Sequence, residues 1–163
     1  MICKNAISII NEKNIKGTID FHQCQGTDNC IVNFNLKGFK PYAIHAIHIH
    51  EYGDLREGCK SLGAHLNLKN KNHGNLNDIK NSHTGDLINN IHADKNGNFK
   101  YSYRDPRIQL NGNIDKSIIG CSIVIHEGID DLGLGGNEES LKTGNAGSRM
   151  ACSIIGKAKD GSL

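Results

Sequence analysis

The stretch "AIHAIHIHEYGD", residues 43–54, interleaves isoleucine with histidine before it enters a polar segment. In an extended chain alternate side chains point to opposite faces, so His48 and His50 project from one face and the isoleucines beside them from the other. The pattern predicts a strand with one apolar face and two imidazoles that can chelate a metal ion. His45 lies three positions before His48, on the opposite face, and is predicted to be a structural, hydrogen-bonding histidine.

Short runs rich in β-branched and aromatic residues recur along the chain. Turn-forming residues separate several of them, including "NEKN" at 11–14 and "DKNGN" at 94–98. No segment of useful length shows a clean 3.6-residue apolar period. The sequence therefore predicts an all-β sandwich or barrel of eight short strands. The expected strands are about 2–10, 15–22, 30–37, 42–50, 87–92, 98–103, 117–125 and 150–157.

Length and charge narrow the class of protein further. A chain of 163 residues suits a single domain, 1–163, with enough residues to bury a core without help from a metal. The formal net charge of +2, without a basic run, predicts neither nucleic acid nor an anionic membrane as a partner. No window approaches the roughly 18 apolar residues of a membrane span, and the first residues lack the apolar core of a signal peptide. We therefore expect a soluble, cytoplasmic or otherwise intracellular protein.

Two connections, 51–86 and 126–149, are unusually long for a compact domain, and such connections are commonly functional. The first carries four nitrogen or oxygen donors, a set typical of tetrahedral Zn²⁺ sites, and the second begins at His126. Together with the two strand histidines these donors are too many for one zinc ion, and imidazole-rich sites without sulfur suit copper or zinc. The spacing predicts two metals and leaves the second one open. The four donors of the first connection are His65, His73, His83 and Asp86.

Three motifs give the chain a resemblance to the intracellular Cu/Zn superoxide dismutase family over nearly its whole length. They are "HIHEYGD" (48–54), "HTGDL" (83–87) and "GNEESLKTGNAGSRMAC" (136–152). The resemblance implies an eight-stranded Greek-key β-barrel with two long functional loops, a zinc loop and an electrostatic loop. It also implies an antioxidant oxidoreductase that converts superoxide to molecular oxygen and hydrogen peroxide by cycling copper between Cu(II) and Cu(I).

Position by position, the resemblance implies one copper and one zinc ion per subunit. His65 would be shared between them and would be catalytic, because a bridging imidazole that has lost both ring protons can store and release one. Arg149 would be the second catalytic residue, a fixed cation that attracts and orients superoxide. The implied copper ligands are His48, His50, His65 and His126, and the implied zinc ligands are His65, His73, His83 and Asp86.

Other implied residues support these two sites. Asp130 would join His48 to His73 by hydrogen bonds outside the metals. The 126–149 connection holds more acids than bases, so electrostatic guidance must come from the placement of charges. The residues implied in this guidance are Glu138, Glu139, Lys142 and Thr143.

The six cysteines form no Cys-x-x-Cys pair, which argues against a zinc ribbon or a thioredoxin-type motif. Reduced thiols are the default in an intracellular protein. The resemblance nevertheless implies a disulfide between Cys59 and Cys152. It assigns no role to the remaining four, which are expected to be thiols: Cys3, Cys24, Cys30 and Cys121.

The resemblance also implies a homodimer and raises a copper-delivery protein as a second partner. Lys157 stands where an apolar residue is usual in the family, so it is expected to weaken the dimer. The implied dimer contacts are Gly53, Asp54, Ile119, Gly120 and Ile154.

Three other functions fit parts of the sequence. A non-catalytic copper-delivery protein or metal buffer predicts missing copper ligands or an added cysteine-rich motif, and a copper-only variant predicts a missing zinc loop. A mononuclear zinc hydrolase would use Glu51 or Glu127 as its base, but leaves one histidine set without a role. Copper and zinc content measured together with superoxide dismutation would distinguish all of them.

Overall fold

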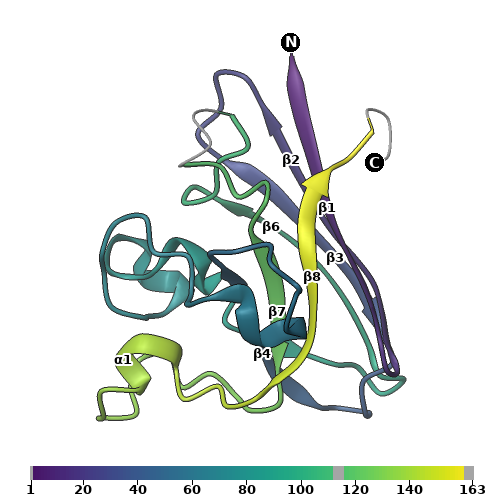
Figure 1. Ribbon diagram of the computed structural model, residues 1–163, viewed down its shortest axis with the longest axis vertical. Helices are drawn as coiled ribbons and strands as arrows, with labels where there is room; N and C mark the ends of the chain where they lie inside the picture. The colour runs from purple at the N-terminus through teal and green to yellow at the C-terminus, as the bar shows by residue number, and fades with distance from the viewer. Residues whose placement is uncertain (1, 112–115, 160–163) are drawn as a thin grey trace.

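The computed structural model describes residues 2–111 and 116–159, which form one eight-stranded sheet (Figure 1). The strand order is β5-β4-β7-β8-β1-β2-β3-β6, and the neighbouring strands pair antiparallel. The sheet curls into a nearly closed barrel with β5 and β6 at its open edges. The strands are β1 (Cys3–Glu12), β2 (Ile15–Cys24), β3 (Cys30–Lys37), β4 (Ile44–His50), β5 (Asn90–His92), β6 (Asn98–Asp105), β7 (Ser122–His126) and β8 (Arg149–Lys157).

The all-β prediction and its eight strands are confirmed, and only two boundaries differ by three residues or more. Residues 87–89 precede β5 in a turn, because Leu87 and Asn89 both adopt positive φ angles, of 45° and 61°. Residues 117–121 also turn, since the Cys121 N–H donates to the Ile118 carbonyl and Gly120 has a φ of 97°. The strand predicted over 117–125 is therefore only β7.

The tight turns lie where the sequence places them. Lys13 and Asn14 alone separate β1 from β2, and Lys13 adopts a φ of 51°. Between β5 and β6, the Asp94 carboxylate accepts the backbone N–H groups of Asn96 and Asn98, at 2.7 and 2.9 Å. Such side-chain caps are the physical reason that Asp and Asn are frequent in turns.

The core lies inside the barrel and is built by alternation along the strands. In β2, for example, Ile19 and Phe21 are fully buried, while Lys16 is exposed. Burying one such side chain contributes about 1.5–3 kcal/mol. β4 and β7 differ because they are buried on both faces: Ile47 and Ile49 face the core, and the histidine face is also covered.

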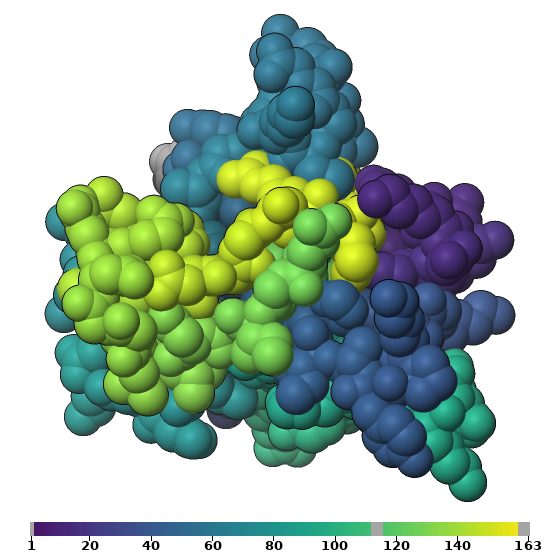
Figure 2. Space-filling view, turned by 90° about the horizontal axis from the view of Figure 1, so that it is seen from below, coloured from purple at the N-terminus to yellow at the C-terminus, as the bar shows by residue number. Residues whose placement is uncertain are grey.

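The two long connections cover the histidine face and contain short helices. In Figure 1 they lie together beside β4 and β7, and in Figure 2 the 126–149 connection forms a broad yellow-green lobe. The first connection holds η1 (Gly58–Leu62), η2 (Leu76–Asn81) and η3 (Thr84–Asp86), and the second holds α1 (Ser140–Thr143). Within the described residues, no helix is both long and apolar enough to span a bilayer.

Candidate metal centre

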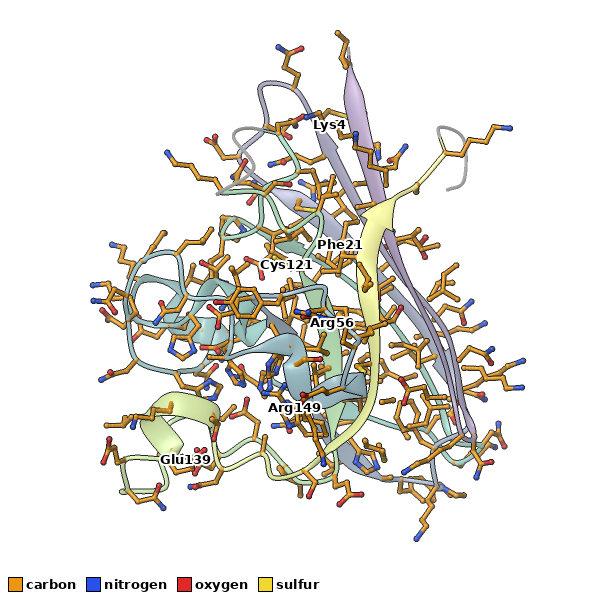
Figure 3. All side chains as sticks on the ribbon, in the orientation of Figure 1. Lys4, Phe21, Arg56, Cys121, Glu139 and Arg149 are labelled. Atoms are coloured by element: carbon orange, nitrogen blue, oxygen red, sulfur yellow. A yellow bond between two sulfur atoms is a disulfide. The ribbon has the colours of Figure 1, made fainter. Side chains whose placement is uncertain are left out.

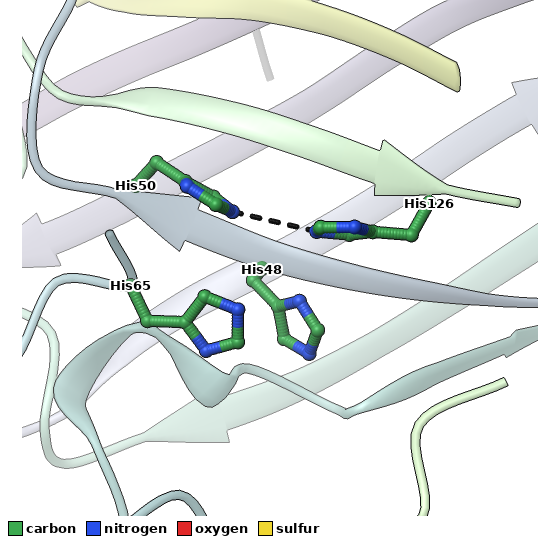
Figure 4. A group of neighbouring side chains, drawn as sticks. All are labelled: His48, His50, His65 and His126. Carbon is green, nitrogen blue, oxygen red and sulfur yellow. Dashed lines mark hydrogen bonds between the residues drawn. The ribbon is translucent and has the colours of Figure 1, made fainter. Parts of the chain in front are cut away.

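Four buried histidines from three parts of the chain converge on the outer face of β4 (Figure 4). His48 and His50 alternate along β4, as the sequence predicts. Val124 of β7 pairs with His48, so His126, two residues further on, lies on the same face. An isolated bridge with His50 brings in His65 from the first connection. One nitrogen from each ring lies within 4.8 Å of the others, and we call these four residues the strand group.

Hydrogen bonds around the strand group set the tautomers of three of its four rings. His50 Nδ1 donates to the Gly63 carbonyl at 2.9 Å and His126 Nδ1 to the Gly147 carbonyl at 3.1 Å. His48 uses its other nitrogen, Nε2, to contact Asp130 Oδ2 at 2.7 Å. Each of these three rings is thereby left with one lone-pair nitrogen, since the second nitrogen of a neutral imidazole is an acceptor.

The free nitrogens face one another in a way that suits a cation. His50 Nε2 and His126 Nε2 lie 3.4 Å apart (Figure 4), yet in these tautomers neither has a proton to share. His48 Nδ1 and His65 Nε2 are buried without any hydrogen-bond partner. Buried polar atoms without partners are costly, and a bound metal ion satisfies them. The four imidazoles therefore fit the copper ion implied by the resemblance.

A second set of donors lies beside the first, and we call it the loop group: His65, His73, His83 and Asp86. Asp86 Oδ1 lies 2.8 Å from His73 Nδ1, 3.1 Å from His83 Nδ1 and 3.2 Å from His65 Nδ1. The other oxygen, Oδ2, accepts the backbone N–H groups of Gly74 and His83. Three imidazoles and one carboxylate within 4.8 Å of one another match the ligand number and type of a tetrahedral Zn²⁺ site.

His65 belongs to both groups. Its Nδ1 faces Asp86 of the loop group, whereas its Nε2 is the unpartnered atom on the strand-group side. The ring is buried, and its centroid lies 3.9 Å from that of His48. One imidazole is thus placed to bind two cations at once.

Asp130 links the two groups from behind, as the resemblance implies. Its two carboxylate oxygens lie 2.7 Å from His48 Nε2 and 2.7 Å from His73 Nε2. Asn89 donates its side-chain amide to Asp130 Oδ2 at 3.0 Å, and Asn90 bonds both backbone polar groups of Asp130. The sequence analysis did not predict a role for these two asparagines. Their only signal in the sequence is that asparagine, a poor strand former, occurs at the start of β5.

Burial controls the protonation of the strand group. It lowers the pKa of His48 and of His126 to about 4 and that of His65 to about 3, and it also lowers the pKa of His50. The rings are therefore neutral at neutral pH, the form that binds metals.

In the loop group, hydrogen bonding overcomes burial. Burial alone would lower the pKa of His73, but the hydrogen bonds to Asp130 and Asp86 raise it to about 9. Asp86 of the loop group and Asp130 behind it are also buried, which opposes their ionisation. Hydrogen bonds from the histidines nevertheless hold the pKa of each carboxyl well below its usual range. Both carboxylates are thus charged and available to cations.

A cavity of about 770 Å³ opens onto the strand group, and His50, His65, His126 and Arg149 lie in its wall. Arg149, labelled in Figure 3, donates to the Cys59 carbonyl at 2.6 Å and to the Gly63 carbonyl at 2.5 Å. Burial lowers the pKa of Arg149, but a guanidinium remains charged at neutral pH. The disulfide Cys59–Cys152 joins η1 to β8 and so fixes the loop that holds this arginine.

Three of the four residues implied in electrostatic guidance also line the cavity. Glu139, Lys142 and Thr143 do so, whereas Glu138 is absent from the wall and pairs with Lys142 at 2.5 Å. Lys71, which the sequence did not single out, adds a cation from the first connection.

Arg107 anchors the first connection to the barrel and was also missed from the sequence. It is 4% exposed, and it donates to the Asp105 carboxylate, to Ser82 Oγ and to the carbonyls of His83 and Leu87. Because Asp105 ends β6, this arginine fixes both flanks of η3 against the sheet. A lone buried arginine near an aspartate two residues away is a weak signal in a sequence, since most such pairs are exposed.

The structure tests three smaller predictions. His45 lies outside both groups and its Nδ1 lies 3.0 Å from the His126 carbonyl, so its structural role is confirmed. Cys30 and Cys121 are buried free thiols, as expected. The prediction of thiols at Cys3 and Cys24 is wrong, because β1 and β2 pair in a register that places them opposite each other, and they form a disulfide.

The fold and the two donor groups define a class of protein: a histidine-rich, dinuclear metalloprotein built on a β-barrel. Comparisons with known proteins identify the family within this class. The family model "Copper/zinc superoxide dismutase (SODC)" matches residues 15–155. The chain is 47% identical over 156 residues to a Cu-Zn superoxide dismutase of Paramecium bursaria Chlorella virus 1, covering 96% of this chain and 80% of the relative. It is 42% identical over 152 residues to the Saccharomyces cerevisiae enzyme, covering 93% and 96%.

A solved structure agrees with these relatives. The crystal structure of the clock protein EA4 superposes with a TM-score of 0.88 at 39% identity and covers 97% of both chains. The chain therefore belongs to the Cu/Zn superoxide dismutase family. The family and the two donor groups together imply copper and zinc as its metals.

Proposed function

We propose that the chain dismutates superoxide, converting two superoxide anions and two protons to molecular oxygen and hydrogen peroxide in antioxidant defence. The observation that carries the proposal is His65, which offers one ring nitrogen to each donor group. We assign His48, His50, His65 and His126 to copper, and His65, His73, His83 and Asp86 to zinc. Bound copper would supply the one-electron redox chemistry. Bound zinc has no accessible second oxidation state, so it would supply positive charge and hold its ligands in position.

His65 would act as the proton carrier of the reaction. Its Nε2 is buried and faces the strand group, while its Nδ1 stays directed at Asp86. A proton held on Nε2 in one half of the cycle can be given to the reduced substrate in the other. Asp130 would keep the neighbouring rings in place during this exchange, because it accepts from both His48 and His73.

Arg149 would capture and orient the anion. Two backbone carbonyls fix its guanidinium at the cavity wall, so little ordering remains to be done when superoxide arrives. Lys71 and Lys142 add positive charge to the same wall against Glu51 and Glu139. We propose that this placement guides superoxide, with Glu138 acting through its ion pair to Lys142.

The rival functions account for less of the site. A zinc hydrolase needs a free base near its metal, but the Glu51 carboxylate accepts the Ala64 N–H at 3.1 Å and Glu127 is exposed. A copper-only protein has no use for the loop group, and a metal buffer has no use for the fixed Arg149.

The test is metal content and dismutation in a single preparation. We expect close to one copper and one zinc per chain and rapid removal of a superoxide flux. His65→Ala should lose the activity, whereas His92→Asn, a change at an exposed histidine, should keep it. A protein loaded only with zinc, without copper affinity or dismutation, would overturn the proposal.

We propose a homodimer as the assembly. Supporting this, Gly53, Gly120 and Ile154 lie together: a Cβ on Gly53 would meet the Gly120 carbonyl at 2.4 Å and the Ile154 side chain at 3.3 Å. Ile154 is 39% exposed, so an apolar side chain beside these two glycines is available to a partner subunit. Sedimentation analysis would test the dimer; a monomer at micromolar concentration would contradict it, whereas Lys157→Ile should tighten it.

The remaining proposals concern the domain, the copper source and the compartment. We propose one domain over 1–163, which predicts a single unfolding transition in calorimetry. We propose loading by a copper-delivery protein, so copper content should fall in a host that lacks one. We place the protein in the cytoplasm, and recovery from secreted fractions alone would contradict this.

A further inference from the structure

Away from the metal centre, a second cluster of metal-binding side chains lies on the outer face of β1 and β2. Cys3 pairs with Cys24 and Asn5 pairs with His22 in the register of these strands, so the four side chains share one face. One ligand atom from each of Cys3, His22 and Cys24 lies within 4.8 Å of the others. Cys3 follows the N-terminus at the upper end of β1 in Figure 1, and its neighbour Lys4 is labelled there in Figure 3, far from Arg149.

His22 is already oriented as metal-binding histidines are. Its Nδ1 lies 2.6 Å from the Asn5 side-chain oxygen, which accepts the ring proton and leaves a lone pair on Nε2. This Nε2 lies 3.3 Å from Cys24 Sγ. A disulfide sulfur has no proton to donate, so Nε2 gains no hydrogen bond from it. A carboxylate, amide or carbonyl behind the ring is the usual device that aims an imidazole at a metal.

We propose that Cys3, His22 and Cys24 form a redox-gated metal site: a disulfide when oxidised, and a two-sulfur, one-nitrogen site for Zn²⁺ or Cu⁺ when reduced. Reduction by two equivalents of a low-molecular-weight thiol breaks the S–S bond, forms two cysteine thiols and leaves the reductant as its own disulfide. Metal binding then releases two protons. Thiolate and imidazole are the donors that these cations prefer, and three protein ligands leave a position for water.

The strands allow this change because they are joined independently of the disulfide. The β1–β2 pairing runs over ten residue pairs, from Cys3 opposite Cys24 to Glu12 opposite Ile15. The Cα atoms of the two cysteines lie 3.8 Å apart, so the thiols stay adjacent after reduction. Among the residues that the structure describes, β8 pairs with β1 at Ala6–Ser8 and the Ala158 N–H reaches the Asn5 carbonyl, so the contact with β8 ends before Cys3.

The site is also accessible. All three side chains are half-buried, and a surface cavity of about 210 Å³ is lined by His22 and Cys24. Arg104 lines the same cavity and favours the thiolate form of the cysteines. In the other disulfide Cys59 is also half-buried, but its partner Cys152 is only 5% exposed, so a limiting reductant should open Cys3–Cys24 first.

The test uses the whole protein with copper and zinc in its main centre. A limiting amount of a phosphine reductant is added and removed, and mass spectrometry after alkylation identifies the opened cysteines. Cd²⁺ is then titrated as the probe, with Zn²⁺ as competitor, and thiolate-to-cadmium absorption is recorded in the ultraviolet. The main centre has only nitrogen and oxygen donors, so this absorption reports cysteine ligation alone.

We expect one Cd²⁺ per chain, bound only after reduction and displaced by Zn²⁺. The variant Cys3→Ser/Cys24→Ser should lose the absorption and keep full dismutase activity. Asn5→Ala should weaken Cd²⁺ binding about tenfold, the usual effect of removing the partner behind a histidine ligand. His22→Asn should weaken it further, and the surface control His92→Asn should not change it.

Three results would overturn the proposal. One is the absence of thiolate absorption when both cysteines are shown to be free. Another is absorption that survives in Cys3→Ser/Cys24→Ser, which would place the cadmium at Cys59 and Cys152. The last is reduction of Cys59–Cys152 before Cys3–Cys24.

Discussion

Asp130→Asn tests how the two donor groups are coupled. The native carboxylate is 2% exposed and accepts from both His48 and His73 at 2.7 Å, whereas an amide of the same shape has only one acceptor oxygen. One ring therefore keeps its partner, and the Nε2–H of the other faces an NH₂ group. A hydrogen bond to a charged group contributes about 1.5–3 kcal/mol, so the affinity for at least one metal should fall about ten- to a hundredfold.

The assay is competition with chelators of known affinity, run separately for Zn²⁺ and Cu²⁺ on the metal-free protein. Asp131→Asn is the matched control, because Asp131 bonds Ser140 and Asn145 and neither donor group. We expect the control to bind both metals as the wild type does. Unchanged affinities in a folded Asp130→Asn protein would refute the coupling, and an equal loss in Asp131→Asn would assign the effect to the loop as a whole.

Four further predictions follow from the same geometry. Arg149→Ile should lower the dismutation rate about tenfold at low salt and flatten its dependence on ionic strength, within the range known for charged clefts, Cu/Zn superoxide dismutases included; an unchanged rate with copper fully loaded would exclude this arginine. Arg107→Ala leaves Asp105 buried and unpaired, so calorimetry should show a loss of about 3–5 kcal/mol and weaker zinc binding; the reasoning fails if both stay unchanged. Burial raises the pKa of Cys30 to about 12 and that of Cys121 to about 11, so iodoacetamide should label both thiols only after denaturation. Mass spectrometry would detect the labels, and rapid labelling of the native protein would contradict their burial. The metal-free protein should lose stability as the pH falls from about 6.5 towards 4, because the buried rings of His48 and His126 resist protonation. Urea denaturation at several pH values measures this, and a free energy of unfolding that does not change with pH would be inconsistent with buried neutral rings.

Stability depends on pH because the folded and unfolded states bind different numbers of protons. Between about pH 4 and 6.5 the strand-group histidines are protonated in the unfolded chain and neutral in the folded one, so stability rises with pH. His73 acts in the other direction at higher pH. With a folded pKa of about 9 it binds a proton in the folded protein that the unfolded chain has lost, so its contribution disappears between about pH 6.5 and 9. We therefore expect maximal stability near pH 6.5.

Much of the fold could be predicted because its signals are local. Period-two alternation and turn residues placed all eight strands, and the errors exceed two residues only where backbone turns at Leu87, Asn89 and Gly120 shorten two of them. The direction of His48 and His50 also follows from alternation. His65, His73, His83 and Asp86 were recognised as donors from residue type and spacing, and the motif resemblance assigned all four to zinc and shared His65 with copper.

The sequence by itself determined which residues can form strands and which side chains can bind metals, because both depend on residue type and near neighbours. Only the tertiary structure decided which ring nitrogen each histidine presents, because Gly63, Gly147 and Asp130 reach the rings from distant segments. It also decided that Cys3 meets Cys24 and that Arg107 anchors the first connection. These contacts depend on strand register and on loops crossing the barrel, and neither is encoded within any short stretch of the chain.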